Sequence, residues 1–209
     1  MGPRIKICGL TRAEDVRTAV DAGADALGLV FYPPSPRFVA PEQAAALARL
    51  APPFVSVVGL FVNAEAQVVR KTLQAVSLHL LQFHGDEDED YCRQFERPYI
   101  KAARMKPGFD LLQYCAAFPT AQAILVDAFV EGYGGSGKVF DWNLIPPVLP
   151  KPLILSGGLA AGNVGEAVFR VRPAAVDVSS GVEAAKGIKD AEKIRAFVSA
   201  VRAAKAMTD

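Results

Sequence analysis

The sequence of 209 residues has only three cysteines, Cys8, Cys92 and Cys115, and they lie far apart. An odd number of widely spaced cysteines argues against a disulfide framework and favours a reducing compartment, so we expect a cytoplasmic protein. The close Cys and His pairs that hold zinc are also missing, and we therefore expect no metal site.

The sequence also lacks an excess of charge of either sign, because 23 Lys and Arg residues nearly balance 22 Asp and Glu residues. No basic stripe indicates nucleic-acid binding. The first residues, MGPRIK, contain no long apolar segment typical of a signal peptide. No uncharged apolar run reaches the roughly 18 residues that a membrane helix needs, so we expect neither a nucleic-acid nor a membrane partner.

Apolar residues, by contrast, make up 51% of the chain, which is enough for a sizeable core. Eight short apolar runs of strand-forming character recur along it. They start roughly 20 to 30 residues apart, which is the length of one βα unit. The predicted strands lie at residues 4–8, 26–31, 55–62, 78–84, 99–103, 123–127, 152–156 and 175–180.

Helical patterns separate the predicted strands and have recognisable boundaries. Thr11 and Glu14 have the spacing of a capping box at the start of the first helix, and Gly23 stands where a terminating glycine is expected. Asn63 and Asp86 are the expected caps of the third and fourth helices. The helix after the sixth strand is expected to be short, because prolines interrupt it.

Strands that alternate with helices predict a parallel sheet, which is either open and doubly wound or closed into a (β/α)8 TIM barrel. No GxGxxG motif follows the first strand, which weakens the open, dinucleotide-binding alternative. Eight units in 209 residues lie at the compact end of the barrel range. We therefore predict one α/β domain over residues 1–209, a (β/α)8 barrel with minimal loops.

Polar residues stand at the ends of the predicted strands, where the active sites of such barrels lie. The first strand ends in Cys8, the sixth ends in Asp127, and the fourth leads into His84. Arg37 follows the second strand in a loop stiffened by three prolines, which suits a positioned guanidinium. Structural alternatives remain open: Cys8 as a packing residue, Asp127 as a helix cap, His84 as a turn residue and Arg37 as a surface charge.

Small residues follow the last two predicted strands. Gly157 and Gly158 come after the seventh, and Ser180 and Gly181 come after the eighth. Barrels often bind phosphate with these two loops, since small residues let backbone N–H groups approach an anion. We predict a phosphate site here, with tight turns as the alternative. The GGSG stretch at residues 134–137 is interpreted as a mobile lid over the site.

Cys8 and Asp127 could act as base and acid on a small phosphorylated ligand between them. Neither a hydrolase triad nor a metal or cofactor motif accompanies them, so an isomerisation by proton transfer, without cofactor, is the chemistry that remains. Lys6 lies on the same strand face as Cys8, and its charge is expected to lower the pKa of the thiol if the two are close.

Seven stretches, spread from the first strand to the eighth, form a specific combination: KICGLT, GLVFYPPSPRFV, VGLFVN, LQFHGDE, VDAF…GGSGKVFDW, LSGGL…NV and VDVSSGVE…GIKD. Together they resemble the phosphoribosylanthranilate isomerases of tryptophan biosynthesis. The resemblance covers almost the whole chain. It implies a (β/α)8 barrel that converts N-(5-phosphoribosyl)anthranilate to 1-(2-carboxyphenylamino)-1-deoxyribulose 5-phosphate in an Amadori rearrangement.

The resemblance also implies roles for individual residues. Asp127 would be the general acid that opens the furanose ring, and Cys8 the general base that removes the C2′ proton. Arg37 would face the anthranilate carboxylate, with His84 and Asp177 also among the substrate-binding residues. The phosphate would be held by Gly157, Gly158, Ser180 and Gly181.

The sequence departs from the family pattern at two places near the predicted phosphate loops. Ala185 and Lys186 precede Gly187, where the family usually has a Pro, and Ser156 stands where Ala is common. Two other functions remain open, a barrel enzyme such as indole-glycerol-phosphate synthase and a non-catalytic sugar-phosphate-binding module. The first would need a Lys and Glu pair at the strand ends. We expect either a monomer or a homodimer.

Overall fold

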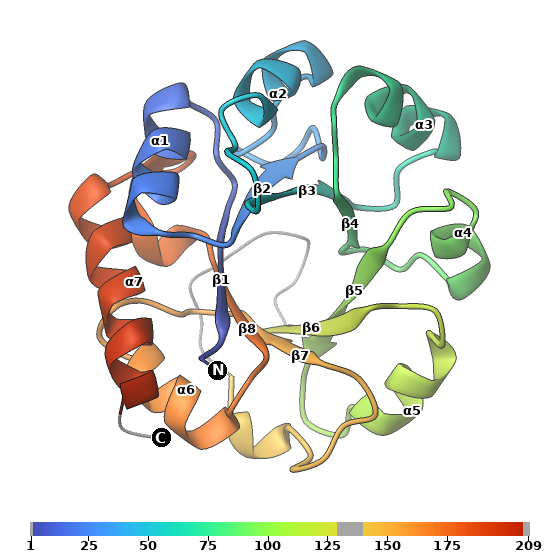
Figure 1. The fold of residues 1–209 in the computed structure, drawn as a ribbon. Helices are drawn as coiled ribbons and strands as arrows, with labels where there is room; N and C mark the ends of the chain where they lie inside the picture. Colours follow the sequence, from blue (N-terminus) through green and yellow to red (C-terminus); the bar gives the residue numbers. More distant parts are fainter. Residues whose placement is uncertain (1, 129–139, 207–209) are drawn as a thin grey trace.

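The computed structural model describes residues 2–128 and 140–206. Eight parallel strands follow one another around a closed barrel, and the last pairs with the first (Figure 1), which confirms the predicted (β/α)8 architecture. The strands are β1 (Arg4–Cys8), β2 (Ala26–Val30), β3 (Ser56–Phe61), β4 (Leu80–Phe83), β5 (Tyr99–Met105), β6 (Ala123–Ala128), β7 (Leu153–Leu155) and β8 (Ala175–Val178).

Helices pack around the outside of the barrel (Figure 1). They are α1 (Ala13–Ala22), α2 (Pro41–Ala48), α3 (Ala66–Ala75), α4 (Glu89–Arg93), α5 (Leu111–Ala117), α6 (Val164–Val171) and α7 (Ala191–Ala206). Between β6 and β7 the described residues form only a short 3-10 helix, η1 (Trp142–Leu144). Pro146 and Pro147 follow it, and their missing N–H groups explain why no α-helix continues there.

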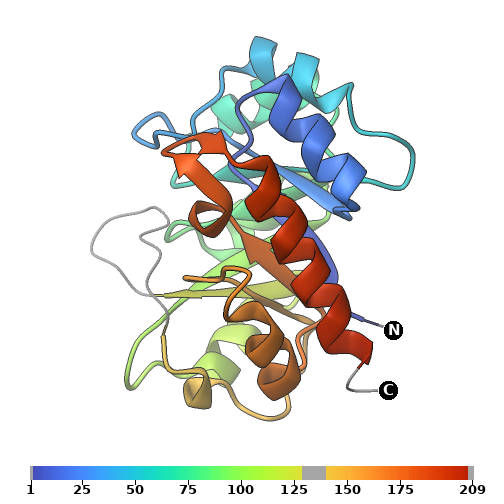
Figure 2. The ribbon, with the colours of Figure 1, turned by 90° about the vertical axis from the view of Figure 1, so that its left-hand side faces the viewer.

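After β8 the chain forms a 3-10 turn, η2 (Ser180–Val182), and then a two-stranded antiparallel hairpin, β9 (Glu183–Ala185) and β10 (Ile188–Lys189). Figure 2 shows this hairpin at one end of the barrel and both chain termini at the opposite end. The strands run from the end with the termini toward the end with the hairpin. The hairpin therefore lies beside the carboxyl ends of the strands, where the predicted site residues stand.

One of the predicted helix boundaries is confirmed. Gly23 ends α1 with φ +93°, and its N–H donates to the carbonyl of Val20. The capping box is wrong, because α1 begins after Arg12 and the Thr11 hydroxyl donates to the carbonyl of Gly187 instead. A tertiary contact has therefore replaced the local one.

The predicted caps of the third and fourth helices are also wrong. The Asn63 side chain accepts a hydrogen bond from the N–H of Asp86, so these two residues join the loops after β3 and β4. Helix α3 begins after Glu65, and the cap of α4 is Asp88, which accepts from the N–H of Tyr91. A side chain that serves a neighbouring loop is no longer free to cap its own helix.

The strands are buried on both faces, because helices cover the outside and side chains fill the inside. Ile5 and Ile7 of β1 face outward and belong to the main core between strands and helices. Cys8 instead belongs to a small separate cluster, which is completed by Val30, Leu60 and Val62. This cluster forms an apolar floor beneath the carboxyl ends of the strands.

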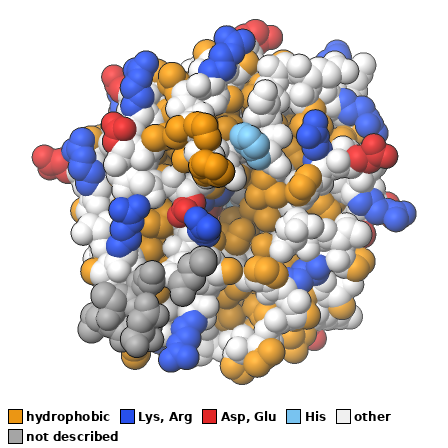
Figure 3. Space-filling model, viewed as in Figure 1, with side chains coloured by type: hydrophobic (Ala, Val, Ile, Leu, Met, Phe, Trp, Pro, Cys, Tyr) orange, Lys and Arg blue, Asp and Glu red, His pale blue; other side chains and the backbone are white. Residues whose placement is uncertain are grey.

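The opposite, amino-terminal face of the barrel is shown in Figure 3, where hydrophobic side chains gather near the middle. Phe54, in the turn before β3, is fully exposed and has φ +71°. His79, just before β4, is exposed as well, and its Nδ1 accepts from the N–H of Val57. This contact gives His79 a structural role, away from the carboxyl ends of the strands.

Candidate active site

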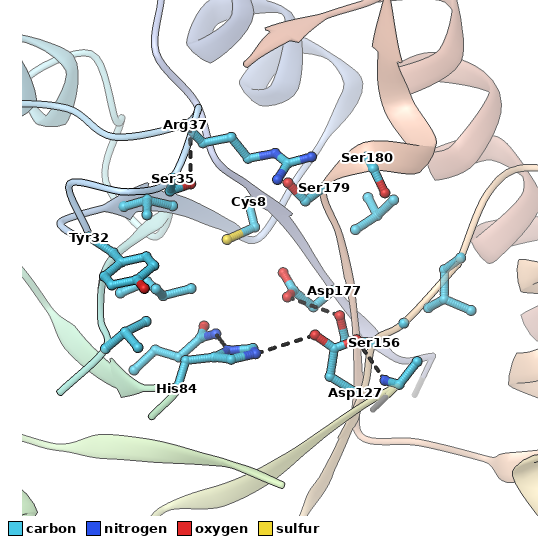
Figure 4. Close-up of a pocket in the computed structure, with 18 of the residues that line it drawn as sticks. Cys8, Tyr32, Ser35, Arg37, His84, Asp127, Ser156, Asp177, Ser179 and Ser180 are labelled. Carbon is cyan, nitrogen blue, oxygen red and sulfur yellow. Dashed lines mark hydrogen bonds and ion pairs between the residues drawn. The ribbon is translucent and has the colours of Figure 1, made fainter. Parts of the chain in front are cut away.

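Most of the sequence-predicted site residues line one pocket at the carboxyl ends of the strands (Figure 4). Gly181 is not one of the residues that line it. Its backbone packs against the next loop, where an added Cβ would lie 1.9 Å from the carbonyl oxygen of Leu159. The predicted residues that the pocket brings together are Cys8, Arg37, His84, Asp127, Gly157, Gly158, Asp177 and Ser180.

Cys8 lies at the bottom of this pocket and is only 3% exposed. Its Sγ fits there because residue 28 on the neighbouring strand is a glycine, and a Cβ on Gly28 would lie 2.7 Å from the sulfur. Burial raises the pKa of the Cys8 thiol, and the nearby charge of Lys6 opposes this rise without cancelling it. Lys6 thus lowers the pKa of the thiol, as expected from its closeness, but burial outweighs this effect and the net shift is upward.

A buried ion pair adds to the effect of burial, because the charge of Asp177 also raises the pKa of Cys8. Lys6 Nζ lies 2.8 Å from Asp177 Oδ1, and both side chains are about 5% exposed. Burial alone would lower the pKa of Lys6, but the Asp177 carboxylate and Cys8 outweigh burial and raise it. Ser156, the first of the two departures from the family pattern, donates to the other Asp177 oxygen at 3.4 Å. The Asp177 charge therefore offsets part of the effect that Lys6 has on the thiol.

The raised pKa of Cys8 predicts how this thiol reacts with iodoacetamide. Only the thiolate is nucleophilic, so the alkylation rate of Cys8 should still be rising above about pH 8.5, where free cysteine is half ionised. Cys92 and Cys115 are also buried, burial raises the pKa of both, and neither lines the pocket, so they should react later. Peptide mapping over a pH series measures the three rates. A Cys8 rate that levels off near neutral pH would contradict the raised pKa.

Arg37 is held by a partner that sequence reasoning missed. Its Nε and Nη2 donate to the two carboxylate oxygens of Glu183 at 2.7 and 2.9 Å, and both side chains are buried. Lys189 Nζ lies 3.0 Å from the same carboxylate, and these two cations lower the pKa of Glu183 although burial opposes them. Within the described chain no partner is found for Nη1 of Arg37, so this nitrogen is free to meet a ligand.

The only signal for Glu183 in the sequence is its place in the stretch VDVSSGVE, directly after the predicted phosphate loop. Glu183 opens the β9–β10 hairpin, which brings it to Arg37 from 146 residues further along the chain. Arg37 is therefore not a surface charge. The bidentate pair fixes the plane of its guanidinium, as the rigid loop with three prolines suggests.

His84 and Asp127 face each other across the pocket (Figure 4). Nε2 of His84 lies 3.3 Å from Oδ2 of Asp127, and the other carboxylate oxygen accepts the N–H of Ala128 at 2.8 Å. On its other side, Nδ1 of His84 lies 2.9 Å from Nε2 of Gln82. Asp127 follows an extended strand and does not cap a helix in the part of the chain that is described. One oxygen of its carboxyl group is thus hydrogen-bonded to the backbone, and the other lies against a ring nitrogen of His84.

The two predicted phosphate loops lie next to each other. Gly157 and Gly158 have φ of +87° and +64°, and the side chain of Asn163 donates to the carbonyl of Gly158. The close approach of Gly181 to Leu159 joins the second loop to the first. Lys186, at the other departure from the family pattern, lies exposed in the turn of the β9–β10 hairpin. The loops thus present small residues and backbone to the pocket, as the prediction of a phosphate site requires.

The remaining predictions concern the lid, metal binding and membrane insertion. Residues 134–137, interpreted as a lid, lie outside the described residues. Over residues 2–128 and 140–206, no group of three His, Cys, Asp or Glu residues could hold a metal ion. No helix in these segments is long and apolar enough to cross a membrane.

Comparisons with known proteins agree with this geometry. The family model of N-(5'-phosphoribosyl)anthranilate (PRA) isomerase matches residues 5–200. The N-(5'-phosphoribosyl)anthranilate isomerase of Dechloromonas aromatica (strain RCB) is 66% identical over 204 residues, which is 98% of each chain. A crystal structure of phosphoribosyl anthranilate isomerase from Thermotoga maritima is 42% identical, with a TM-score of 0.87 over 96% of this chain and 99% of that one.

A third similar protein is a phosphoribosyl anthranilate isomerase whose crystal structure holds reduced 1-(o-carboxyphenylamino)-1-deoxyribulose 5-phosphate. It is 40% identical, with a TM-score of 0.83 over 96% of this chain and 99% of that one. The family model and the high identity over nearly full length agree with the resemblance of the sequence motifs. The chain therefore belongs to the N-(5'-phosphoribosyl)anthranilate isomerase family.

Proposed function

We propose that this pocket catalyses the Amadori rearrangement of N-(5'-phosphoribosyl)anthranilate to 1-(2-carboxyphenylamino)-1-deoxyribulose 5-phosphate, a reaction of tryptophan biosynthesis. The observation that carries the proposal is the arrangement of Cys8 and Asp127, which come from β1 and β6 and line one pocket in a chain of this family. The similar structure with a reduced form of the product supports the same ligand chemistry.

Asp127 is the proposed general acid of the first step. Its protonated carboxyl group delivers a proton to the furanose ring oxygen, while the bond between that oxygen and C1′ breaks. The lone pair of the anthranilate nitrogen forms a C=N bond to C1′, which gives an open-chain Schiff base. The carboxylate left behind accepts the N–H of Ala128, which stabilises its negative charge, and its other oxygen lies 3.3 Å from Nε2 of His84.

Cys8 is the proposed general base of the second step. Its thiolate removes the proton from C2′, and the electrons of that C–H bond form a C1′–C2′ double bond as the C=N bond becomes a C–N bond. The resulting enolamine then loses the proton of its C2′ hydroxyl and gains one at C1′, which yields the ketose. These proton transfers balance with an acid and a base alone, so the proposed route uses neither a metal nor a cofactor.

The remaining polar groups are proposed to bind the ends of the substrate. Nη1 of Arg37, which has no partner among residues 2–128 and 140–206, donates to the anthranilate carboxylate, and Glu183 keeps the guanidinium in place. Gly157, Gly158 and Ser180 supply backbone to the 5′-phosphate, while Gly181, which does not line the pocket, sets the shape of its loop through its close approach to Leu159. His84 and Asp177 lie beside the reacting sugar, where Asp177 is already bound to Lys6.

The alternative of an indole-glycerol-phosphate synthase fits the pocket less well. That chemistry needs a lysine and a glutamate that both face the substrate, but Lys6 is paired with Asp177 and Glu183 is paired with Arg37. Lys101 is buried against Glu87 and does not line the pocket. The pocket offers a thiol and a carboxyl group instead.

The activity is tested by incubating the protein with N-(5'-phosphoribosyl)anthranilate and following the loss of substrate fluorescence. We expect catalytic loss of the signal, with the ketose phosphate identified by mass spectrometry. Binding without turnover would favour the non-catalytic sugar-phosphate module. Turnover to an indole product, given the ketose as substrate, would favour the synthase.

The cellular location, oligomeric state and partners of the enzyme are also proposed from the sequence. We infer a cytoplasmic enzyme that is a monomer or a homodimer, acts on a small phosphorylated substrate and uses no nucleic-acid or membrane partner. Sedimentation of the pure protein distinguishes the two assembly states.

Replacing Arg37 with Ala should raise KM about 10- to 150-fold, because a hydrogen bond between charged groups is worth about 1.5–3 kcal/mol. Arg37→Lys should recover only part of this loss, since one ammonium group cannot hold Glu183 at two points and also reach the substrate. Steady-state kinetics measure both variants. Glu183→Gln is the matched control, because it keeps the Arg37 charge and loosens only its position. An unchanged KM in Arg37→Ala would argue against the carboxylate contact.

A further inference from the structure

Gln82 is a buried polar residue that the mechanism has not used. It is the third residue of β4, it is 0% exposed, and it lines the pocket. Its Oε1 is one of only two buried side-chain N or O atoms in the described segments that have no hydrogen-bond partner, and the other is Nε1 of Trp142. Buried polar groups are almost always paired, so an unpaired oxygen at a site of proton transfer needs an explanation.

The contact between the Gln82 amide nitrogen and His84 determines which of the two ring nitrogens of His84 is protonated. Nε2 of Gln82 can only donate, so Nδ1 of His84, 2.9 Å away, must accept and is unprotonated. In the neutral ring the proton then lies on Nε2, which is 3.3 Å from Oδ2 of Asp127. A chain of donors thus runs from Gln82 through His84 to Asp127.

The reversed orientation of the Gln82 amide is less favourable. It would put the oxygen against Nδ1 of His84 and would leave an NH₂ group with two buried donors where the unpaired oxygen now lies. Orphaned buried N–H groups are rarer in proteins than under-satisfied oxygens. The amide nitrogen of Gln82 therefore faces the ring of His84, and the amide oxygen is left without a hydrogen-bond partner as a result.

We propose that Gln82 is a positioning residue that holds His84 in the Nε2–H tautomer, so that the ring donates to Asp127. This inference rests on the proposed role of Asp127 as general acid. With Nε2–H as donor, His84 stabilises the carboxylate that remains after Asp127 has given its proton to the ring oxygen. The other tautomer would present a lone pair to Asp127, would accept the carboxyl proton itself, and would compete with the substrate for it.

The tautomer can be read directly by NMR of protein labelled with ¹⁵N in its histidines. The chain contains only two, and His79 serves as an internal control. Nδ1 of His79 accepts from the N–H of Val57 at 2.9 Å, so His79 should be in the same Nε2–H form, on the opposite face of the barrel. At a pH where both rings are neutral, we expect a protonated Nε2 and an unprotonated Nδ1 for both. A protonated Nδ1 at His84 in the unaltered protein would overturn the proposal without any variant.

Gln82→Glu and Gln82→Met test the consequence for catalysis. An ionised glutamate side chain at this position would accept where Gln82 donates, so His84 should move to the Nδ1–H form or become doubly protonated, while His79 stays unchanged. Met removes the donor at similar volume, so His84 should populate both tautomers. A general acid contributes about 10²–10⁴-fold, so loss of its positioning should lower kcat by about 10- to 100-fold in Gln82→Glu and by less in Gln82→Met.

The comparison of kcat with KM separates this role from a structural one. We expect KM to stay near the wild-type value, because Arg37 and the phosphate loops are untouched, and thermal melting identifies a variant that does not fold. A shifted His84 tautomer with unchanged kcat would overturn the proposal, as would lost activity with His84 still in the Nε2–H form. If the unaltered protein does not convert the substrate at all, the proposed function fails, while the NMR result still reports on the tautomer.

Discussion

Replacing Asp127 with Asn is expected to lower kcat by about 10²–10⁴-fold, the usual contribution of a general acid. Asn has nearly the same shape but no transferable proton, so the furanose ring would open only by the slow uncatalysed route. Steady-state kinetics with the fluorescent substrate measure the loss. Asp90→Asn is a matched control, since Asp90 is a mostly exposed carboxylate paired with Arg93 and does not line the pocket.

The surroundings of Asp127 also predict how this variant behaves as a protein. One oxygen accepts the N–H of Ala128 and the other lies against Nε2 of His84, so the amide group of Asn must turn its own NH₂ toward one of them. Such a mismatch costs about 1–3 kcal/mol of stability. Binding of the reduced product analogue and a thermal melt separate this cost from the catalytic loss. Near-normal kcat in the variant would show that Asp127 is not the acid.

Cys8→Ser should lower kcat by a similar factor, about 10²–10⁴-fold. The serine oxygen is smaller than sulfur and fits beside Gly28, but a hydroxyl is a far weaker acid than a thiol, even one whose pKa is raised by burial, so serine supplies far less of the anion that removes the C2′ proton. The kinetics are compared with those of Cys115→Ser, which makes the same change at a buried thiol in α5 that does not line the pocket. The control should keep its kcat. An equal kcat in both variants would show that Cys8 is only a packing residue and not the base.

Local patterns were sufficient to predict the barrel. Strands of a parallel barrel are apolar on both faces, so the run that becomes β3 was visible as residues 55–62, against the observed Ser56–Phe61. The chain direction then places every strand end on one rim, which is why Cys8, His84 and Asp127 could be expected together. These inferences need only the order and spacing of elements along the chain.

Contacts between distant residues could not be predicted in the same way. Glu183 meets Arg37 across 146 residues, and Asp177 meets Lys6 across 171. No spacing rule links such positions. The net direction of the Cys8 pKa could not be predicted either, because the burial that raises it most and the nearby Asp177 charge are both set by the fold. The helix caps failed for a related reason, as Asn63 bonds to the neighbouring loop.

Deuterium at C2′ of the substrate tests the central claim, that Cys8 removes the C2′ hydrogen after Asp127 has opened the ring. The reaction is run with the unaltered protein, with Cys8→Ser and with Asp127→Asn. Cyanoborohydride is present in each sample, because it reduces an open-chain Schiff base to a stable amine. An enzyme-free sample corrects for spontaneous ring opening.

The unaltered protein should give the ketose, from which the C2′ deuterium has been lost. Cys8→Ser should instead accumulate the trapped open-chain amine with its deuterium retained, and Asp127→Asn should give no more of it than the enzyme-free sample. Mass spectrometry distinguishes these products. Formation of the ketose by Cys8→Ser at the rate of the unaltered protein, with loss of the deuterium, would contradict the account.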